Sequence, residues 1–242
     1  MYENGFSVQK DIKQAVEWYK KAADQGNAIA QLNLGSMYYK GEGVQKDYKK
    51  AVEWYKKAAD QGYESAQSNL GIMYYNGEGV EKDYKKAVEW DKKAADQGYA
   101  NAQSNLGNMY YNGEGVQKDY KRAAEWYKKA ADQGNANAQT ILGNMYYNGE
   151  GVQKDIKQAV EWNKKAADQG YANAQNFLGN MYETGKGVEK DYKKAVEWYK
   201  KAADQGNEGA QFALGGMYRN GEGVQKDYKQ AVEWFKKSAN QG

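Results

Sequence analysis

The hydrophobic positions form two helical patterns within each stretch of about 36 residues, and residues 99–134 show both clearly. The first pattern places Ala102, Leu106, Met109 and Tyr110 at i, i+4, i+7 and i+8. This spacing puts them on one face of a helix, so we expect a first helix from about Ala100 to Tyr111. Gly113 is positioned to end that helix, and Asp119 to cap the start of the next one. A second helix is predicted from the apolar stripe Tyr120, Ala123, Ala124, Trp126, Tyr127, Ala130 and Ala131.

The two-helix pattern recurs along the whole chain with a constant period. Tryptophan occurs every 36 residues, at Trp18, Trp54, Trp90, Trp126, Trp162, Trp198 and Trp234. The whole repeats are 27–62, 63–98, 99–134, 135–170, 171–206 and 207–242, after a partial repeat at 1–26. Because one helix pair cannot bury its apolar face alone, we predict an all-α structure, a single α/α solenoid domain over residues 1–242.

Each whole repeat also keeps a glycine inside its first helix, which is unusual because glycine weakens helices. These glycines are Gly35, Gly71, Gly107, Gly143, Gly179 and Gly215. We expect the second helix of each pair to cross closely at this point, where a side chain would clash.

The recurring residues resemble those of the Sel1-like repeat family, a relative of the tetratricopeptide repeat. In the third whole repeat they are Ala102, Leu106, Gly107, Met109, Tyr110, Gly113, Gly115, Val116, Asp119, Ala123, Trp126, Lys129, Ala130, Ala131 and Gly134. The resemblance implies a right-handed superhelix whose first helices line the concave face, and adaptor or scaffold work. The chain departs from the family where Gln117 and Glu81 replace a common proline, and where Ser7 replaces a loop glycine. A cysteine-rich branch of the family is linked to β-lactam binding or hydrolysis, and this chain, without cysteine, does not match it.

Composition narrows the classes of function. The 35 basic and 32 acidic residues leave a net charge of +3, too small to indicate a nucleic-acid or membrane partner. The absence of histidine and cysteine removes the commonest metal ligands and nucleophiles, so we expect no catalytic site, metal or cofactor. We expect neither a signal peptide nor a transmembrane segment. This favours the cytoplasm by default and leaves export open.

The positions that differ between repeats form one stripe on the first helices, predicted to lie opposite the buried face. The stripe includes Ser68, Ser104 and Thr140, and its middle is rich in asparagine, whose amide both donates and accepts hydrogen bonds. We therefore predict a protein- or peptide-binding site on the concave face, with Phe177 as the best apolar anchor. Its residues are Asn33, Asn69, Asn101, Asn105, Asn108, Asn137, Ile141, Asn144, Asn173, Asn176, Phe177, Asn180 and Phe212. The alternative is that these asparagines are solvated filler copied by duplication.

Other interpretations stay open at this point. The tyrosine ladder could stack RNA bases, although packing explains it more simply. A β-lactam-handling enzyme is a further alternative, and near-identical repeats also fit a recent duplication or a consensus design without an evolved partner. Neither end carries a polar capping helix, and Met1 and Tyr2 match the last turn of a first helix. We therefore expect fraying at the N-terminus, end-to-end association or a longer natural chain.

Overall fold

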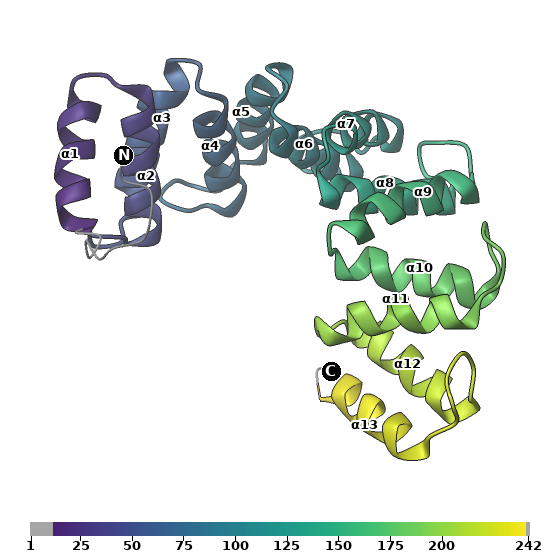
Figure 1. Cartoon of the computed structure of the whole chain (residues 1–242). Coiled ribbons are helices and arrows are strands. Elements are labelled where there is room, and N and C mark those ends of the chain that lie inside the picture. Colours follow the sequence, from purple (N-terminus) through teal and green to yellow (C-terminus); the bar gives the residue numbers. More distant parts are fainter. Residues whose placement is uncertain (1–11, 241–242) are drawn as a thin grey trace, which may run out of the picture. The chain divides into compact units, whose positions relative to one another are not determined.

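The computed structural model describes residues 12–240, which form thirteen α-helices and no strand. They fall into two compact units that divide between Lys118 and Asp119, and within each unit successive helices pack side by side (Figure 1). The first unit contains α1 (Ile12–Asp24), α2 (Ala28–Lys40), α3 (Tyr48–Asp60), α4 (Glu64–Asn76), α5 (Tyr84–Asp96) and α6 (Ala100–Asn112). The second contains α7 (Tyr120–Asp132), α8 (Ala136–Asn148), α9 (Ile156–Asp168), α10 (Ala172–Thr184), α11 (Tyr192–Asp204), α12 (Glu208–Asn220) and α13 (Tyr228–Ala239). The expectations for Met1, Tyr2 and Ser7 lie outside the described residues.

The predicted helix ends are confirmed. Gly113 follows α6 with a φ of 81°, in the left-handed region, and its amide donates to the Met109 carbonyl at 2.8 Å. This closes the last turn in a conformation that glycine adopts without a steric cost. The carboxylate of Asp119 accepts from the Arg122 backbone amide at 3.0 Å and caps α7. These local signals set where each helix starts and stops.

The core of each repeat is built from one leucine, one methionine and several alanines. Leu106 and Met109 of α6 are buried, and in α7 Ala123, Ala130 and Tyr127 are buried as well. Alanine lets helices approach closely, so much of the core consists of backbone packed against small side chains. The predicted apolar faces of both helices are therefore confirmed.

In five of the six whole repeats, the glycine inside the first helix marks a close helix crossing, as the sequence predicts. A Cβ atom at Gly35 of α2 would lie 2.6 Å from Cδ1 of Tyr55 in α3, a distance that real Cβ atoms do not tolerate. The same crossing brings Gly71 against Asp91, Gly143 against Asn163, Gly179 against Tyr199 and Gly215 against Phe235. The cost of a helical glycine is thus offset by the packing of the next helix.

A chain of glutamine side chains, which the sequence reading did not single out, ties consecutive helices together. Gln31 of α2 is buried and donates from Nε2 to the Ala23 carbonyl at the end of α1, at 3.1 Å. Gln61, at the end of α3, donates from Nε2 to Oε1 of Gln31 at 2.8 Å. The same pair of bonds recurs with Gln67 and Gln97 one repeat later. Buried helix-terminal carbonyls are satisfied in this way by residues that every repeat carries.

One part of the stripe prediction is wrong. Ser68, Ser104 and Thr140 are buried, with exposed fractions of 2%, 4% and 7%. Ser68 of α4 donates to Asp91 of α5, the second helix of the same repeat, and Thr140 donates to the Ala136 carbonyl of its own helix, α8. Ser68 therefore takes part in a helix–helix contact, and none of the three side chains is exposed as the stripe predicts.

Candidate functional site

An open groove of about 900 Å³ crosses three consecutive first helices of the second unit. Its walls come mainly from α8, α10 and α12, so each repeat contributes one helix to it. Because these helices recur at a regular interval, the same positions of the repeat line the groove three times. The lining is formed by Asn137, Thr140, Ile141, Asn144, Tyr147, Asn148, Tyr171, Asn173, Asn176, Phe177, Asn180, Met181, Glu183, Tyr199, Gly209, Phe212, Ala213, Gly216, Arg219, Asn220 and Glu222.

The groove brings together eight of the thirteen predicted site residues: Asn137, Ile141, Asn144, Asn173, Asn176, Phe177, Asn180 and Phe212. The other five lie in the first unit. Asn105 and Asn108 line a separate, smaller pocket, whereas Asn33, Asn69 and Asn101 line neither pocket.

The amides of the groove differ in what they already contact. Asn173 accepts from Nδ2 of Asn207 at 2.9 Å, so its oxygen is already engaged. Both Asn144 and Asn180 are exposed on the groove surface. An amide has two donor hydrogens and an acceptor oxygen, which leaves capacity for further bonds at these positions.

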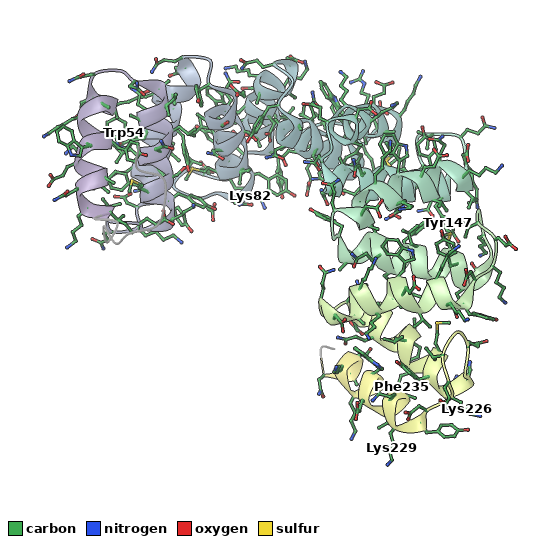
Figure 2. The ribbon with its side chains drawn as sticks, in the orientation of Figure 1. Trp54, Lys82, Tyr147, Lys226, Lys229 and Phe235 are labelled. Carbon is green, nitrogen blue, oxygen red and sulfur yellow. The ribbon has the colours of Figure 1, made fainter. Side chains whose placement is uncertain are left out.

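Two aromatic side chains provide the apolar part of the groove. Phe177 is half-buried and meets the ring of Tyr147 edge-on, with the ring centroids 5.4 Å apart. Phe212 is 64% exposed and lies 5.3 Å from the ring of Phe235. Figure 2 labels both partner rings, Tyr147 on α8 and Phe235 on α13. Phe212 therefore offers more free apolar surface than Phe177, which the sequence reading had preferred as the anchor.

Three charged residues of the groove were missed by the sequence reading. Glu183 accepts a hydrogen bond from the Tyr199 hydroxyl, and burial together with this carboxylate raises the pKa of Tyr199 above its usual value. Arg219 and Glu222 complete the charged lining. A signal did exist, because earlier repeats hold tyrosine where Glu183 and Arg219 stand.

The smaller pocket, of about 190 Å³, lies in the first unit between α4, α5 and α6. Asp91 of α5 stands where Tyr55 and Tyr127 stand in other repeats, and it has no exposed surface. Its Oδ1 accepts from Ser68 Oγ and Asn105 Nδ2, each at 3.1 Å, while Oδ2 has no hydrogen-bond partner. Burial raises the pKa of Asp91 to about 7. The remaining lining comes from Ile72, Tyr75, Asn105, Asn108, Met109 and Asn112.

Residues 12–240 contain neither a cluster of metal-ligating side chains nor a helix suited to span a membrane. No group of three or more His, Cys, Asp or Glu side chains in this part of the chain is arranged to hold a metal ion. None of its helices is long and apolar enough to cross a membrane.

The repeat pattern matches the model of the Sel1 repeat seven times, at residues 1–27, 28–63, 64–99, 100–135, 136–171, 172–207 and 209–242. The chain belongs to the Sel1 repeat family. Sel1 repeat proteins are generally scaffolds that mediate protein interactions, and this chain has the family's all-α helical-repeat fold. The first five whole repeats begin one residue later in the family's register than in the register set by the tryptophans, and the sixth begins two residues later.

Solved Sel1 repeat structures agree with this fold. The chain is 44% identical to a protective antigen of uropathogenic Escherichia coli strains, with a TM-score of 0.89 over 94% of this chain. It spans about half of that structure, 49% of its length. A Sel1 repeat protein from Oxalobacter formigenes is 39% identical, with a TM-score of 0.88 over 96% of this chain and 95% of that one. An immunity protein from Pseudomonas aeruginosa is 26% identical, with a TM-score of 0.52, over 99% of this chain and 84% of that one. No protein with a curated description matches the chain.

Proposed function

We propose that the chain is a non-catalytic scaffold whose groove on α8, α10 and α12 binds an extended polypeptide. The observation that supports this most is the gathering of eight predicted residues into one open groove of about 900 Å³. An extended peptide presents a backbone amide and carbonyl at every residue. Asparagine side chains repeated along the groove can pair with such a backbone without requiring a particular sequence.

The exposed ring of Phe212 provides the anchor of this site. Binding energy in interfaces concentrates on a few large side chains, whereas each amide contact contributes about 0.5–1.5 kcal/mol. Affinity therefore comes from repeated weak polar contacts together with one aromatic contact, and Ile141 and Phe177 extend the apolar surface.

The absence of a side chain at Gly216 of α12 would let a ligand backbone pass close to the helix. A Cβ atom at Gly216 would meet no atom of the protein within 4 Å, in contrast to the crossing glycines. Glycine inside a helix costs about 0.5–1 kcal/mol relative to alanine, and no packing contact offsets that cost here. Other repeats hold Asn108, Asn144 or Asn180 at this position. The missing side chain leaves room for the ligand.

The test uses twelve-residue peptides selected from a random library on the intact chain. Asn144→Ala with Asn180→Ala should weaken the selected peptides about tenfold or more, and Phe212→Ala should weaken them further. The matched control is Lys157→Ala with Lys193→Ala, two exposed positions on second helices. If the lysine pair abolishes binding and the asparagine pair does not, the peptide uses the other face and the proposal is wrong.

A further inference from the structure

We propose that the pocket beside Asp91 binds a primary alkylammonium group, the chemical group that ends a lysine side chain. The pocket lies in the first unit and does not include the groove of α8, α10 and α12. The inference therefore stands independently of the proposed peptide site. The buried carboxyl of Asp91 stands at a repeat position that holds a larger, aromatic side chain in most other repeats.

Asp91 occupies a position that is aromatic in most other repeats. Tyr55 fills the corresponding space in α3, where its ring packs on Gly35 and its hydroxyl lies 3.1 Å from Ser36 Oγ. Asp91 has a shorter side chain, and a pocket of about 190 Å³ borders it. This repeat position therefore combines an acidic side chain, Asp91, with a neighbouring cavity.

The carboxyl is incompletely satisfied within the protein. Ser68 and Asn105 donate to Oδ1, while Oδ2 has no donor although the side chain is fully buried. A buried polar atom without a partner is costly, and a ligand that donates a hydrogen bond removes that cost. An ammonium group carries three donors and a charge of the required sign.

The walls of the pocket suit the rest of such a ligand. Ile72 and Met109 provide apolar surface for an alkyl stem. Facing Asp91, α4 contributes Ser68 and Tyr75 and α6 contributes Asn105 and Asn108, which are uncharged at neutral pH.

A second carboxylate stands beside this pocket. Glu114 accepts from the Tyr75 hydroxyl at 2.8 Å and from Nδ2 of Asn112 at 3.1 Å, and both donors line the pocket. Both acidic groups therefore favour a cation.

The experiment measures the binding of n-butylammonium to the full chain, with n-pentanol, a neutral alcohol that is one carbon longer, as the comparison. The ¹³C shift of the Asp91 carboxyl is followed through a pH titration with and without each compound. We expect n-butylammonium to lower the apparent pKa of Asp91 and to bind at least tenfold more tightly than n-pentanol. Equal binding of the two compounds, or no change in the titration of Asp91, would overturn the proposal.

Variants separate the pocket from general surface charge. Asp91→Asn keeps the shape and removes the charge, and Asn163 shows that this repeat position accommodates asparagine. Asp91→Phe fills the pocket, as Phe235 does in the last repeat. Both variants should lose n-butylammonium binding by at least tenfold, and circular dichroism verifies that they fold. The matched control is Asp96→Asn, the same charge change at an exposed position of the same helix. A loss with Asp96→Asn as large as that with Asp91→Asn would also overturn the proposal.

Two further probes distinguish the sources of the ammonium group. N-acetyl-lysine methylamide represents a lysine in a polypeptide, and 1,5-diaminopentane represents a free diamine. Tighter binding of the lysine derivative supports a polypeptide ligand, and tighter binding of the diamine supports a small amine. Binding of both must fall with Asp91→Asn, and retention of either one in that variant contradicts the site.

Discussion

Two helix crossings of the first unit use the same backbone geometry with different chemistry. At the crossing of α2 with α3, Gly35 faces the ring of Tyr55, and at the crossing of α4 with α5, Gly71 faces the carboxyl of Asp91. A Cβ atom at either glycine would lie 2.6 Å from the opposing side chain. The glycine and the surrounding alanines therefore set the crossing, and the residue opposite the glycine can change without a change of fold. The Tyr55 crossing is filled, whereas the Asp91 crossing has an empty pocket and an unpartnered oxygen.

The largest expected effect comes from neutralising Asp91. Its folded-state pKa of about 7 lies above the usual value of 3.8, so the folded state binds the proton more tightly than the unfolded state. The contribution of Asp91 to stability is therefore most favourable below about pH 4, falls as the pH rises towards 7 and levels off above it. We expect Asp91→Asn to raise the free energy of unfolding at pH 8 by on the order of 4 kcal/mol and to change it little at pH 3.5.

Urea unfolding at the two pH values measures this difference, and hydrogen exchange in α4 and α5 locates it. The reciprocal variant is Asn163→Asp, at the same position of the second unit, which should introduce the same kind of pH dependence. An Asp91→Asn variant with an unchanged pH profile would show that the carboxyl is neither buried nor perturbed as described.

A smaller effect is expected when alanine replaces each crossing glycine. In Gly35→Ala the new methyl group meets a rigid ring, and overpacking of this kind typically costs about 1–3 kcal/mol. In Gly71→Ala it meets a short side chain with empty space beside it, so Asp91 can move into the pocket. We expect Gly71→Ala to cost at least about 1 kcal/mol less than Gly35→Ala. Thermal unfolding of the two single variants measures this, and equal losses would mean that the pocket provides no room.

The smallest effect is expected at Gly216, which has no opposing side chain. Gly216→Ala should stabilise the chain by about 0.5–1 kcal/mol, the ordinary gain of alanine over glycine in a helix. The sign is opposite to that for Gly35→Ala. The same variant should weaken peptides selected on the groove, because the added methyl group occupies the space assigned to the ligand. A Gly216→Ala variant that is more stable but binds the peptides as before would show that the ligand does not occupy the space at Gly216.

Much of the fold could be predicted because its signals are local. Gly113 and Asp119 mark helix ends within four residues of the bonds they make, and the helical glycine of each repeat signals a close crossing because nothing else explains its cost. Eight groove residues could be predicted because they lie on the stripe of first-helix positions that differ between repeats. The extent of the solenoid as one continuous domain stays a prediction.

The pocket beside Asp91 could not be recognised in the same way. On a helix rich in lysine, an aspartate looks like one more solvated charge, and only its alignment with the buried Tyr127 shows that the position lies inside the core. The burial of Ser68 was missed for a related reason, because helical spacing alone does not tell how far a neighbouring helix extends over the edge of a stripe. Both errors concern contacts between helices, which are set by packing rather than by local propensity.

The glutamine bonds between helices have a consequence for how such a gene can change. Gln31 and Gln61 bond to each other and to a backbone carbonyl, and Gln67 and Gln97 repeat these bonds with the same partners one repeat later. The bond from Gln31 to Ala23 joins neighbouring repeats, and the bond between Gln61 and Gln31 joins the two helices of one repeat; the glutamines that make them recur in every whole repeat. A duplication or deletion of 36 codons can therefore keep these bonds, so recombination can change the number of helix pairs one at a time, while substitutions at Asp91 or Gly216 diversify individual copies.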